Sequence, residues 1–197
     1  MLTPAMCLSI AAQACLPVLE LGLEYYRDWV EVVVYPAGFL PLQTWTDEAG
    51  VVHQARVPRM GEAWLKGPVV LSWEDVARAG EPGAPHVVIH EFAHKLDMYN
   101  GAADGYPPLH RGMDRVVWQE TFSRAWFHFR RRLARGVEPA IDPYAAESPA
   151  EFFAVLSEVF FTDPAVVVAD YPAVYAQLAL FYRQDPLARL RRAEPGE

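Results

Sequence analysis

The sequence predicts an α+β fold, with strands in the first third of the chain and helices after them. Short runs rich in valine, tyrosine and tryptophan lie between turn residues within residues 31–73. From residue 86 to about residue 192 the apolar residues recur at helical spacing instead. Because 52% of the 197 residues are hydrophobic, the chain can bury one sizeable core, and we expect residues 1–197 to form a single domain.

The first third is expected to contain one helix followed by strands. Residues 4–21 have apolar positions spaced as in a buried helix. Two of the strand-like runs flank the turn sequence Asp-Glu-Ala-Gly, which predicts a hairpin with a longer loop. After the last run, Glu74 and Asp75 are expected to begin a short helix. The four predicted strands are residues 31–35, 39–45, 51–57 and 69–73.

The remainder of the chain is expected to be mainly helical. Asn100 and Gly101 form a typical stop for the first of these helices, and Pro149 occupies the first position of a later one. Pro172 is expected to divide the apolar stretch 164–182 into two short helices. The predicted longer helices are residues 86–98, 113–135 and 148–161.

Charge and composition argue against several classes of protein. Seventeen Lys and Arg against 25 Asp and Glu give a formal net charge of −8, so we expect no nucleic-acid partner. The apolar N-terminus has no Lys or Arg before Arg27 and so lacks the basic start of a signal peptide. In the stretch 164–182, the sequence Asp-Tyr-Pro would break a membrane-spanning helix. We therefore expect a cytoplasmic protein without a membrane segment, in which Cys7 and Cys15 are buried, reduced thiols.

The motif HEFAH, from His90 to His94, carries the chemistry. Positions i and i+4 lie one above the other on a helix, so the two imidazoles can converge on one metal ion. Zinc lowers the pKa of a water that it holds to about 7, and Glu91 is placed to take a proton from that water as it attacks a carbonyl. The pair His86 and His90 has the same spacing but no glutamate between its members, which makes it a weak rival.

A catalytic zinc ion needs a third protein ligand, and the motif does not supply it. No further histidine follows His94 at the spacing of HExxHxxGxxH, so a carboxylate from another helix is expected. Glu151 is one candidate, but with Ser148 it also forms the sequence pattern of a capping box. The residues alone leave three candidates open: Glu147, Glu151 and Glu158.

Longer stretches of the chain resemble one family. Residues 87–109 (VVIHEFAHKLDMYNGAADGYPPL), 142–146 (DPYAA) and 148–161 (SPAEFFAVLSEVFF) are similar to the Mlc titration factor A family, zinc metallopeptidases of the zincin type. The resemblance covers nearly the whole chain, and the string HEFAHKLDMYNG is far more specific than HExxH. It implies a zincin-like metalloprotease domain in which a small mixed sheet packs on the HExxH active-site helix, with a mainly helical C-terminal half.

The resemblance also implies a role for each site residue. It assigns one Zn²⁺ ion to His90, His94 and Glu151. It assigns catalysis to Glu91, the general base, and to Tyr144, a hydrogen-bond donor to the developing oxyanion. The implied reaction is hydrolysis of peptide bonds in a peptide or protein substrate, with a regulatory aminopeptidase as one form of this activity.

Four further expectations accompany this interpretation. Asp97, one turn beyond His94, is expected either to orient an imidazole or to be a plain helix-end carboxylate. Residues 69–73 are expected to be the edge strand along which an extended peptide lies. Because the family is named for sequestering a transcriptional repressor, a binding protein for a repressor of the Mlc type is the alternative function. Family members carry an additional N-terminal helical segment before the part that matches residues 11–21, so this sequence is expected to be short there.

Overall fold

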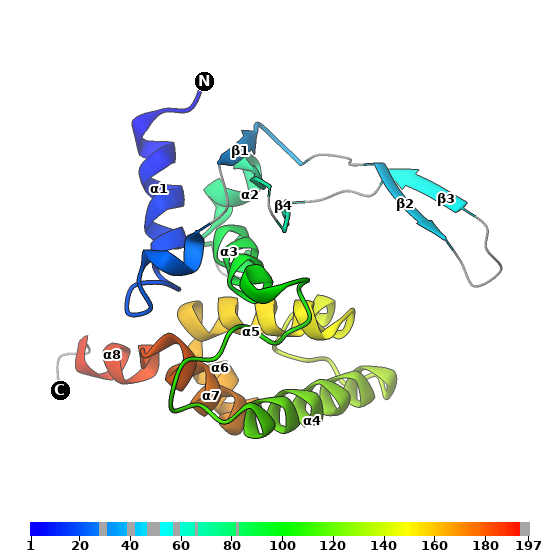
Figure 1. Ribbon diagram of the computed structural model, residues 1–197, viewed down its shortest axis with the longest axis vertical. Coiled ribbons are helices and arrows are strands. Elements are labelled where there is room, and N and C mark those ends of the chain that lie inside the picture. Colours follow the sequence, from blue (N-terminus) through cyan, green and yellow to red (C-terminus); the bar gives the residue numbers. More distant parts are fainter. Residues whose placement is uncertain are drawn as a thin grey trace.

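The computed structural model describes residues 1–27, 31–38, 42–46, 52–56, 60–65, 67–81 and 83–193. Figure 1 shows helix α1 (Pro4–Cys15) and a small sheet on one side of helix α3 (Val87–Asp97) and further helices on the other. Helix α5 (Pro149–Thr162) lies directly beneath α3, and helix α4 (Arg115–Ala134) lies beneath α5. The order of strands and helices along the chain agrees with the expected mixture of a small sheet and mostly helical structure.

The small sheet has three strands in the order β1-β5-β4. Strand β1 (Val32–Tyr35) pairs with β5 (Val69–Ser72) in parallel, and β4 (Gly61–Ala63) pairs with β5 in the antiparallel direction. All four residues of β5 are buried, and neighbouring strands flank it on both sides. The prediction that residues 69–73 form the edge strand is therefore wrong, and β4, which the sequence did not indicate, is at the edge.

The predicted hairpin is confirmed as a two-stranded antiparallel sheet. Strand β2 (Leu42–Thr46) pairs with β3 (Val52–Arg56), with Leu42 opposite Arg56 and Thr46 opposite Val52. The predicted turn between these strands lies outside the described residues.

Helix α1 is shorter and more exposed than predicted. Thr3 caps its start by accepting a hydrogen bond from the Met6 N–H, and the regular helix ends at Cys15. Pro17 has no N–H to continue the hydrogen-bonding pattern, so the chain proceeds in turns. Among the described residues, the buried side chains of α1 are Ile10 and Ala14, and both belong to the packed core.

The two cysteines correct another expectation. Cys7 and Cys15 are free thiols, as predicted, but both are exposed rather than buried. Leu8 between them is 72% exposed. Apolar spacing therefore predicted the helix correctly but overestimated how much of its surface the protein covers.

The predicted helices of the later chain are confirmed, with ends that differ by one or two residues. The helical segment formed by α3 and the following 3-10 turn ends at Gly101. The φ of Gly101 is 154°, a backbone conformation that favours glycine. The apolar stretch 164–182 divides at Pro172, as expected. The remaining helical elements are η1 (Leu23–Tyr26), α2 (Trp73–Arg78), η2 (Met98–Asn100), η3 (Pro143–Ala146), α6 (Pro164–Asp170), α7 (Pro172–Tyr182) and α8 (Pro186–Ala193). None of the described helices is long and apolar enough to cross a membrane.

Buried apolar side chains form two clusters on opposite sides of α3. The sheet cluster consists of Ile10, Ala14, Val69, Leu71, Val76, Val87, Val88 and Phe92. The helical cluster is built mainly from α4, α5 and α7, together with Ala93 and Leu96 of α3. Its aromatic side chains are Trp118, Phe122, Phe129, Phe152, Phe153, Phe160, Tyr171, Phe181 and Tyr182. Helix α3 contributes to both clusters, so it joins the two parts of the core.

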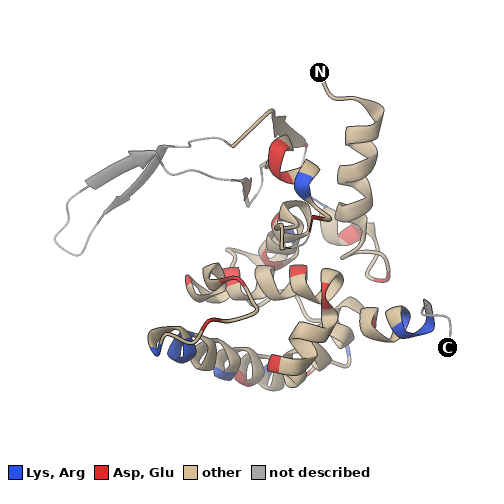
Figure 2. Cartoon of the chain, turned by 180° about the vertical axis from the view of Figure 1, so that it is seen from behind, with Lys and Arg blue, Asp and Glu red and all other residues tan. Residues whose placement is uncertain are grey.

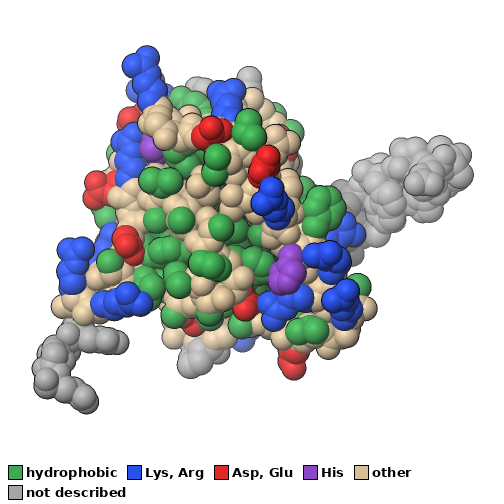
Figure 3. Space-filling model, turned by 90° about the horizontal axis from the view of Figure 1, so that it is seen from below, with side chains coloured by type: hydrophobic (Ala, Val, Ile, Leu, Met, Phe, Trp, Pro, Cys, Tyr) green, Lys and Arg blue, Asp and Glu red, His purple; other side chains and the backbone are tan. Residues whose placement is uncertain are grey.

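Charged side chains are unevenly distributed over the surface. Figure 2 shows Lys and Arg concentrated on α4 and α8, whereas the charged residues of α5 are Glu151 and Glu158, and α5 contains no Lys or Arg. Seen from below, hydrophobic side chains occupy much of the centre of the face, and Lys and Arg lie mostly around it (Figure 3). The contact between α3 and α5 therefore has an acidic helix on one side.

Candidate metal site

The candidate site lies where α3 packs against the first turn of α5. His90 and His94 project from one face of α3, because four residues make about one helical turn. Glu151 is in the first turn of α5. Ser148 caps the start of this helix, and its hydroxyl accepts a hydrogen bond from the Glu151 N–H at 3.1 Å. The local structure of each helix thus brings its side chains to the same place.

The three side chains meet at one point. One carboxylate oxygen of Glu151 lies 3.0 Å from Nε2 of His90 and 3.2 Å from Nε2 of His94. The three potential ligand atoms all lie within 4.8 Å of one another. Two imidazole nitrogens and a carboxylate oxygen are a donor set that suits zinc and similar divalent ions. The residues present therefore fit a metal ion.

The structure distinguishes among the three carboxylates that the sequence left open. Glu151 faces Nε2 of both histidines, whereas Glu158 lies on the other side of the His90 ring, 3.6 Å from Nδ1. Glu147 is exposed at the end of η3. Half of the predicted capping box forms, since Ser148 caps α5, but the Glu151 carboxylate lies against the histidines.

The electrostatics of the site favour positive charge between the imidazoles. Burial opposes protonation of His90, yet Glu151, Glu158 and Glu91 together raise its pKa to about 10. Burial would raise the pKa of Glu151, but hydrogen bonds from His90 and His94 hold it well below its usual range. A bound cation would satisfy the same preference for positive charge.

Glu91 lies beside the edge strand. Its side chain is buried, with the residue 6% exposed, and it approaches the backbone of β4 at Gly61. A Cβ atom on residue 61 would lie 2.5 Å from Oε1 of Glu91. Only glycine lets the backbone of β4 come this close to the glutamate, so Gly61 brings the sheet edge next to the site.

Tyr144 is also brought to the site. It lies in η3, where the Asp142 side chain accepts a hydrogen bond from the Tyr144 N–H at 2.8 Å. Its ring centroid is 6.1 Å from that of His90, and the residue is 41% exposed. The tyrosine therefore stands at the accessible side of the histidine pair.

Asp97 does not orient an imidazole. Its two oxygens accept hydrogen bonds from the Gly105 N–H at 2.7 Å and the Tyr106 N–H at 2.8 Å. The buried Nδ1 of His94 has no hydrogen-bond partner among the described residues. Of the two alternatives predicted for Asp97, the structure favours the helix-end carboxylate, whose oxygens attach the following loop to the end of α3.

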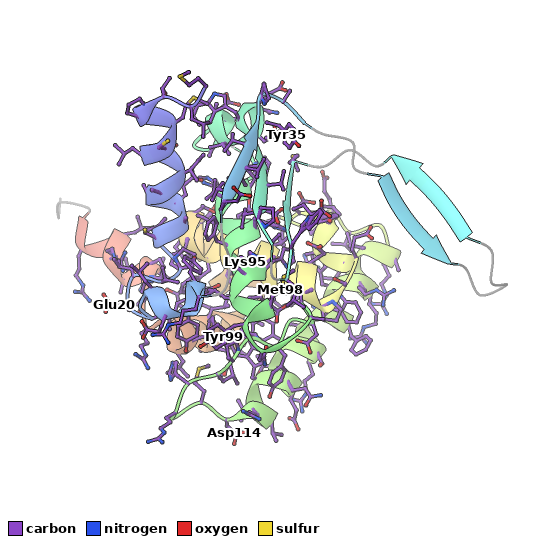
Figure 4. All side chains as sticks on the ribbon, turned by 45° about the horizontal axis from the view of Figure 1, so that its top comes forward. Glu20, Tyr35, Lys95, Met98, Tyr99 and Asp114 are labelled. Atoms are coloured by element: carbon purple, nitrogen blue, oxygen red, sulfur yellow. The ribbon has the colours of Figure 1, made fainter. Side chains whose placement is uncertain are left out.

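Lys95 is a buried residue that the sequence analysis missed. Its Nζ donates hydrogen bonds to the carbonyl oxygens of Trp64 and Gly67, in the turn between β4 and β5. Figure 4 labels Lys95 on α3, close to this end of the sheet. Burial lowers the pKa of Lys95. Nothing in the spacing of HEFAHK indicated this contact, which depends on how the sheet packs on the helix.

Two histidines, a carboxylate and an adjacent glutamate define a site of the kind found in metal-dependent hydrolases. The sequence model of the family described as glucose-regulated metallo-peptidase M90 matches residues 1–183. The chain is also 43% identical over 196 residues to Mlc titration factor A of Yersinia pestis (strain Pestoides F) and of Yersinia pseudotuberculosis serotype O:1b (strain IP 31758). Each match covers 98% of this chain and 72% of the relative. The chain therefore belongs to the M90 metallo-peptidase family.

Proposed function

We propose that this protein is a zinc-dependent peptidase, a single zincin-like domain over residues 1–197 that hydrolyses peptide bonds. The observation that carries the proposal is that the ligand atoms of His90, His94 and Glu151 lie within 4.8 Å of one another. Glu91 lies on α3, the helix that carries both histidines. Membership in a metallo-peptidase family supports it. Glu91 would have no function in a purely structural metal site, which favours catalysis.

The proposed ligands of one Zn²⁺ ion are the Nε2 atoms of His90 and His94 and the Glu151 carboxylate. When bound, zinc makes water a stronger nucleophile at neutral pH and polarises the carbonyl group that is attacked. Glu91 accepts the proton that the attacking water loses and delivers it to the leaving amine. Its burial limits competing contacts with bulk water.

Tyr144 is proposed to act on the oxygen of the scissile carbonyl. As this oxygen gains negative charge, the phenol donates a hydrogen bond to it from the accessible side of the site. The ring lies beside His90, so one substrate carbonyl can approach both groups. Tyr144 is thus the second catalytic residue of the proposal.

We infer that an extended peptide substrate lies along β4 rather than along residues 69–73. Strand β4 is at the edge of the sheet and contacts Glu91 through Gly61. An edge strand offers backbone N–H and C=O groups that an extended peptide can pair with. The hydrogen bonds from Lys95 to the turn after β4 hold that edge in place. An aminopeptidase is one activity that such a site could have.

The test of catalysis compares zinc-loaded wild type with Glu91→Gln on a panel of aminoacyl and short peptide chromogenic substrates. This substitution preserves the shape of residue 91 and the ligands but removes the base. Hydrolysis should fall about 100- to 10,000-fold at equal zinc content. Glu120→Gln, at an exposed position on α4, is the matched control and should keep full activity. Equal activity of wild type and Glu91→Gln would contradict the role of Glu91.

A second candidate function is sequestration of a transcriptional repressor of the Mlc type. The observation in favour is that the relatives are named Mlc titration factor A. We place either function in the cytoplasm, where exposed thiols such as Cys7 and Cys15 stay reduced. Absence of hydrolysis in a zinc-loaded protein that forms a stable complex with a purified repressor of this type would favour the second function over the first.

A further inference from the structure

Helix α5 presents two carboxylates to α3, and the proposed metal ligand is only one of them. Glu158 follows Glu151 by seven residues, about two helical turns, so both side chains lie on the same face of α5. Glu151 lies at Nε2 of His90 and Glu158 at Nδ1. The His90 imidazole is therefore held between two carboxylates of one helix.

Glu158 is fixed by a second contact. Its Oε1 accepts a hydrogen bond of 2.8 Å from the backbone N–H of His86, the residue at the N-terminal cap of α3. The His86 side chain makes no capping hydrogen bond at this end of the helix. The positive end of the α3 dipole also favours a carboxylate here. The first oxygen is thus anchored, and Oε2 points toward His90 at 3.6 Å.

A histidine that binds a metal through Nε2 carries its proton on Nδ1. In a buried ring this N–H needs an acceptor, and the acceptor determines which nitrogen faces the metal. The side chains of His90 and Glu158 are only 12% and 14% exposed, so water is a poor substitute. His94 differs, since its buried Nδ1 has no hydrogen-bond partner among the described residues.

We propose that Glu158 is a positioning residue for the metal site. From the 3.6 Å separation seen here, its Oε2 closes on His90 when the metal is bound and accepts a hydrogen bond from Nδ1–H. It thereby turns Nε2 toward Glu151 and ties this arrangement to the first turn of α3. This inference rests on the proposed metal site of the preceding section. Glu158, a candidate metal ligand in the sequence analysis, instead acts through His90 from the side of the ring opposite the metal.

The test measures zinc affinity of the whole chain by competition with a chromophoric chelator. Glu158→Gln keeps an oxygen for the His86 N–H but places an NH₂ group opposite Nδ1–H of His90. Affinity for zinc should fall about 10- to 100-fold. The matched control is Glu81→Gln, which removes the same charge from an exposed residue paired with Arg78. It should bind zinc within twofold of wild type.

The outcomes separate this inference from the proposed function. If wild type binds no zinc, the proposed function fails. If wild type binds zinc and Glu158→Gln binds it equally well, the positioning role is overturned. Unfolding of the zinc-free proteins by urea is measured alongside. A loss of stability with unchanged zinc affinity would assign Glu158 to capping of α3 alone.

A measurement on zinc-loaded wild type keeps the inference testable even if the variant does not fold. Proton–nitrogen NMR of the His90 ring should show Nε2 bound to zinc and a protonated Nδ1 whose proton is shifted downfield by the carboxylate. Coordination through Nδ1, or an Nδ1 proton that exchanges as fast as an exposed one, would contradict the proposal. A merely structural role of Glu158 predicts no such signature.

Discussion

The sheet cluster and the helical cluster differ in the side chains that fill them. The sheet cluster is mostly small and aliphatic, with Phe92 as its one aromatic member among the described residues. The helical cluster is rich in aromatic rings, and the Trp118 and Phe122 rings stack at 4.2 Å between centroids. The sheet cluster positions the β4 backbone against Glu91, while the helical cluster positions α5 with its carboxylates. The proposed site needs both, because α3 and its histidines lie between them.

The largest predicted effect on stability comes from breaking the helical cluster. Trp118 is fully buried, and its Nε1–H donates a hydrogen bond to the Gly105 carbonyl at 3.2 Å. Trp118→Ala should lower the free energy of unfolding by about 3–5 kcal/mol, measured by urea titration. Leu71→Ala is the matched substitution in the sheet cluster and should cost about 2–5 kcal/mol.

Circular dichroism of the two variants during urea titration shows whether the two clusters unfold together. If the clusters are parts of one cooperative core, each variant should still unfold in a single transition. Two separate transitions would mean that the clusters unfold independently, and the proposal of a single domain would be wrong.

The pH dependence of stability tests the environment of Asp97, at the end of α3. Burial raises its pKa to about 6 from an ordinary 3.8, against the two amide hydrogen bonds that favour the charged form. The folded state therefore holds this proton more tightly than the unfolded state. The stabilising contribution is present below about pH 4 and is lost as pH rises through 6.

In the metal-free protein, the wild type should lose about 2–3 kcal/mol relative to Asp97→Asn between pH 4 and pH 6.5. Asparagine does not titrate, so the difference between the two urea titrations isolates this residue from the other acids. A difference that does not change with pH would show that the hydrogen bonds from the Gly105 and Tyr106 amides fully offset burial and leave the pKa of Asp97 unshifted.

A substitution at the contact between the sheet edge and α3 is expected to change stability least. Its main effect should be on the rate of peptide hydrolysis. In Gly61→Ala the new Cβ would lie 2.5 Å from the Glu91 carboxylate, so the strand or the glutamate must shift. A displacement of about 1 Å can lower the rate of peptide hydrolysis about 100-fold. Zinc affinity should stay unchanged, since the atoms nearest to the new Cβ all belong to Glu91, which is not one of the proposed ligands. A variant with full activity would contradict the claim that the close approach of the β4 backbone positions the Glu91 carboxylate.

The sequence predicted helices α3 and α5 and the hairpin because local spacing and turn residues determine them. It did not predict β4, whose three residues Gly-Glu-Ala have no strand composition of their own. Their strand structure depends on pairing with β5, a tertiary contact. For the same reason the position of β5 at the centre of the sheet could not be read from its own apolar run.

The candidate site shows the same limit. Spacing within α3 was sufficient to predict that His90 and His94 share a face. The choice between Glu151 and Glu158 was open because both lie on one face of α5, and only the packing of α5 on α3 separates them. The family resemblance pointed to Glu151, which lies at both Nε2 atoms. Lys95 and Gly61 gave no signal, since their contacts are with distant parts of the chain.

The most direct test of the central claim is the zinc content of the purified chain after loading and gel filtration, compared with Glu151→Ala. One zinc ion per chain is expected in the wild type, and tight binding should be lost in the variant. Glu147→Ala, at the exposed neighbouring carboxylate, should retain the ion. A wild type that binds no zinc, or a Glu151→Ala variant that binds it as tightly as wild type, would contradict a metal site formed where the two clusters meet.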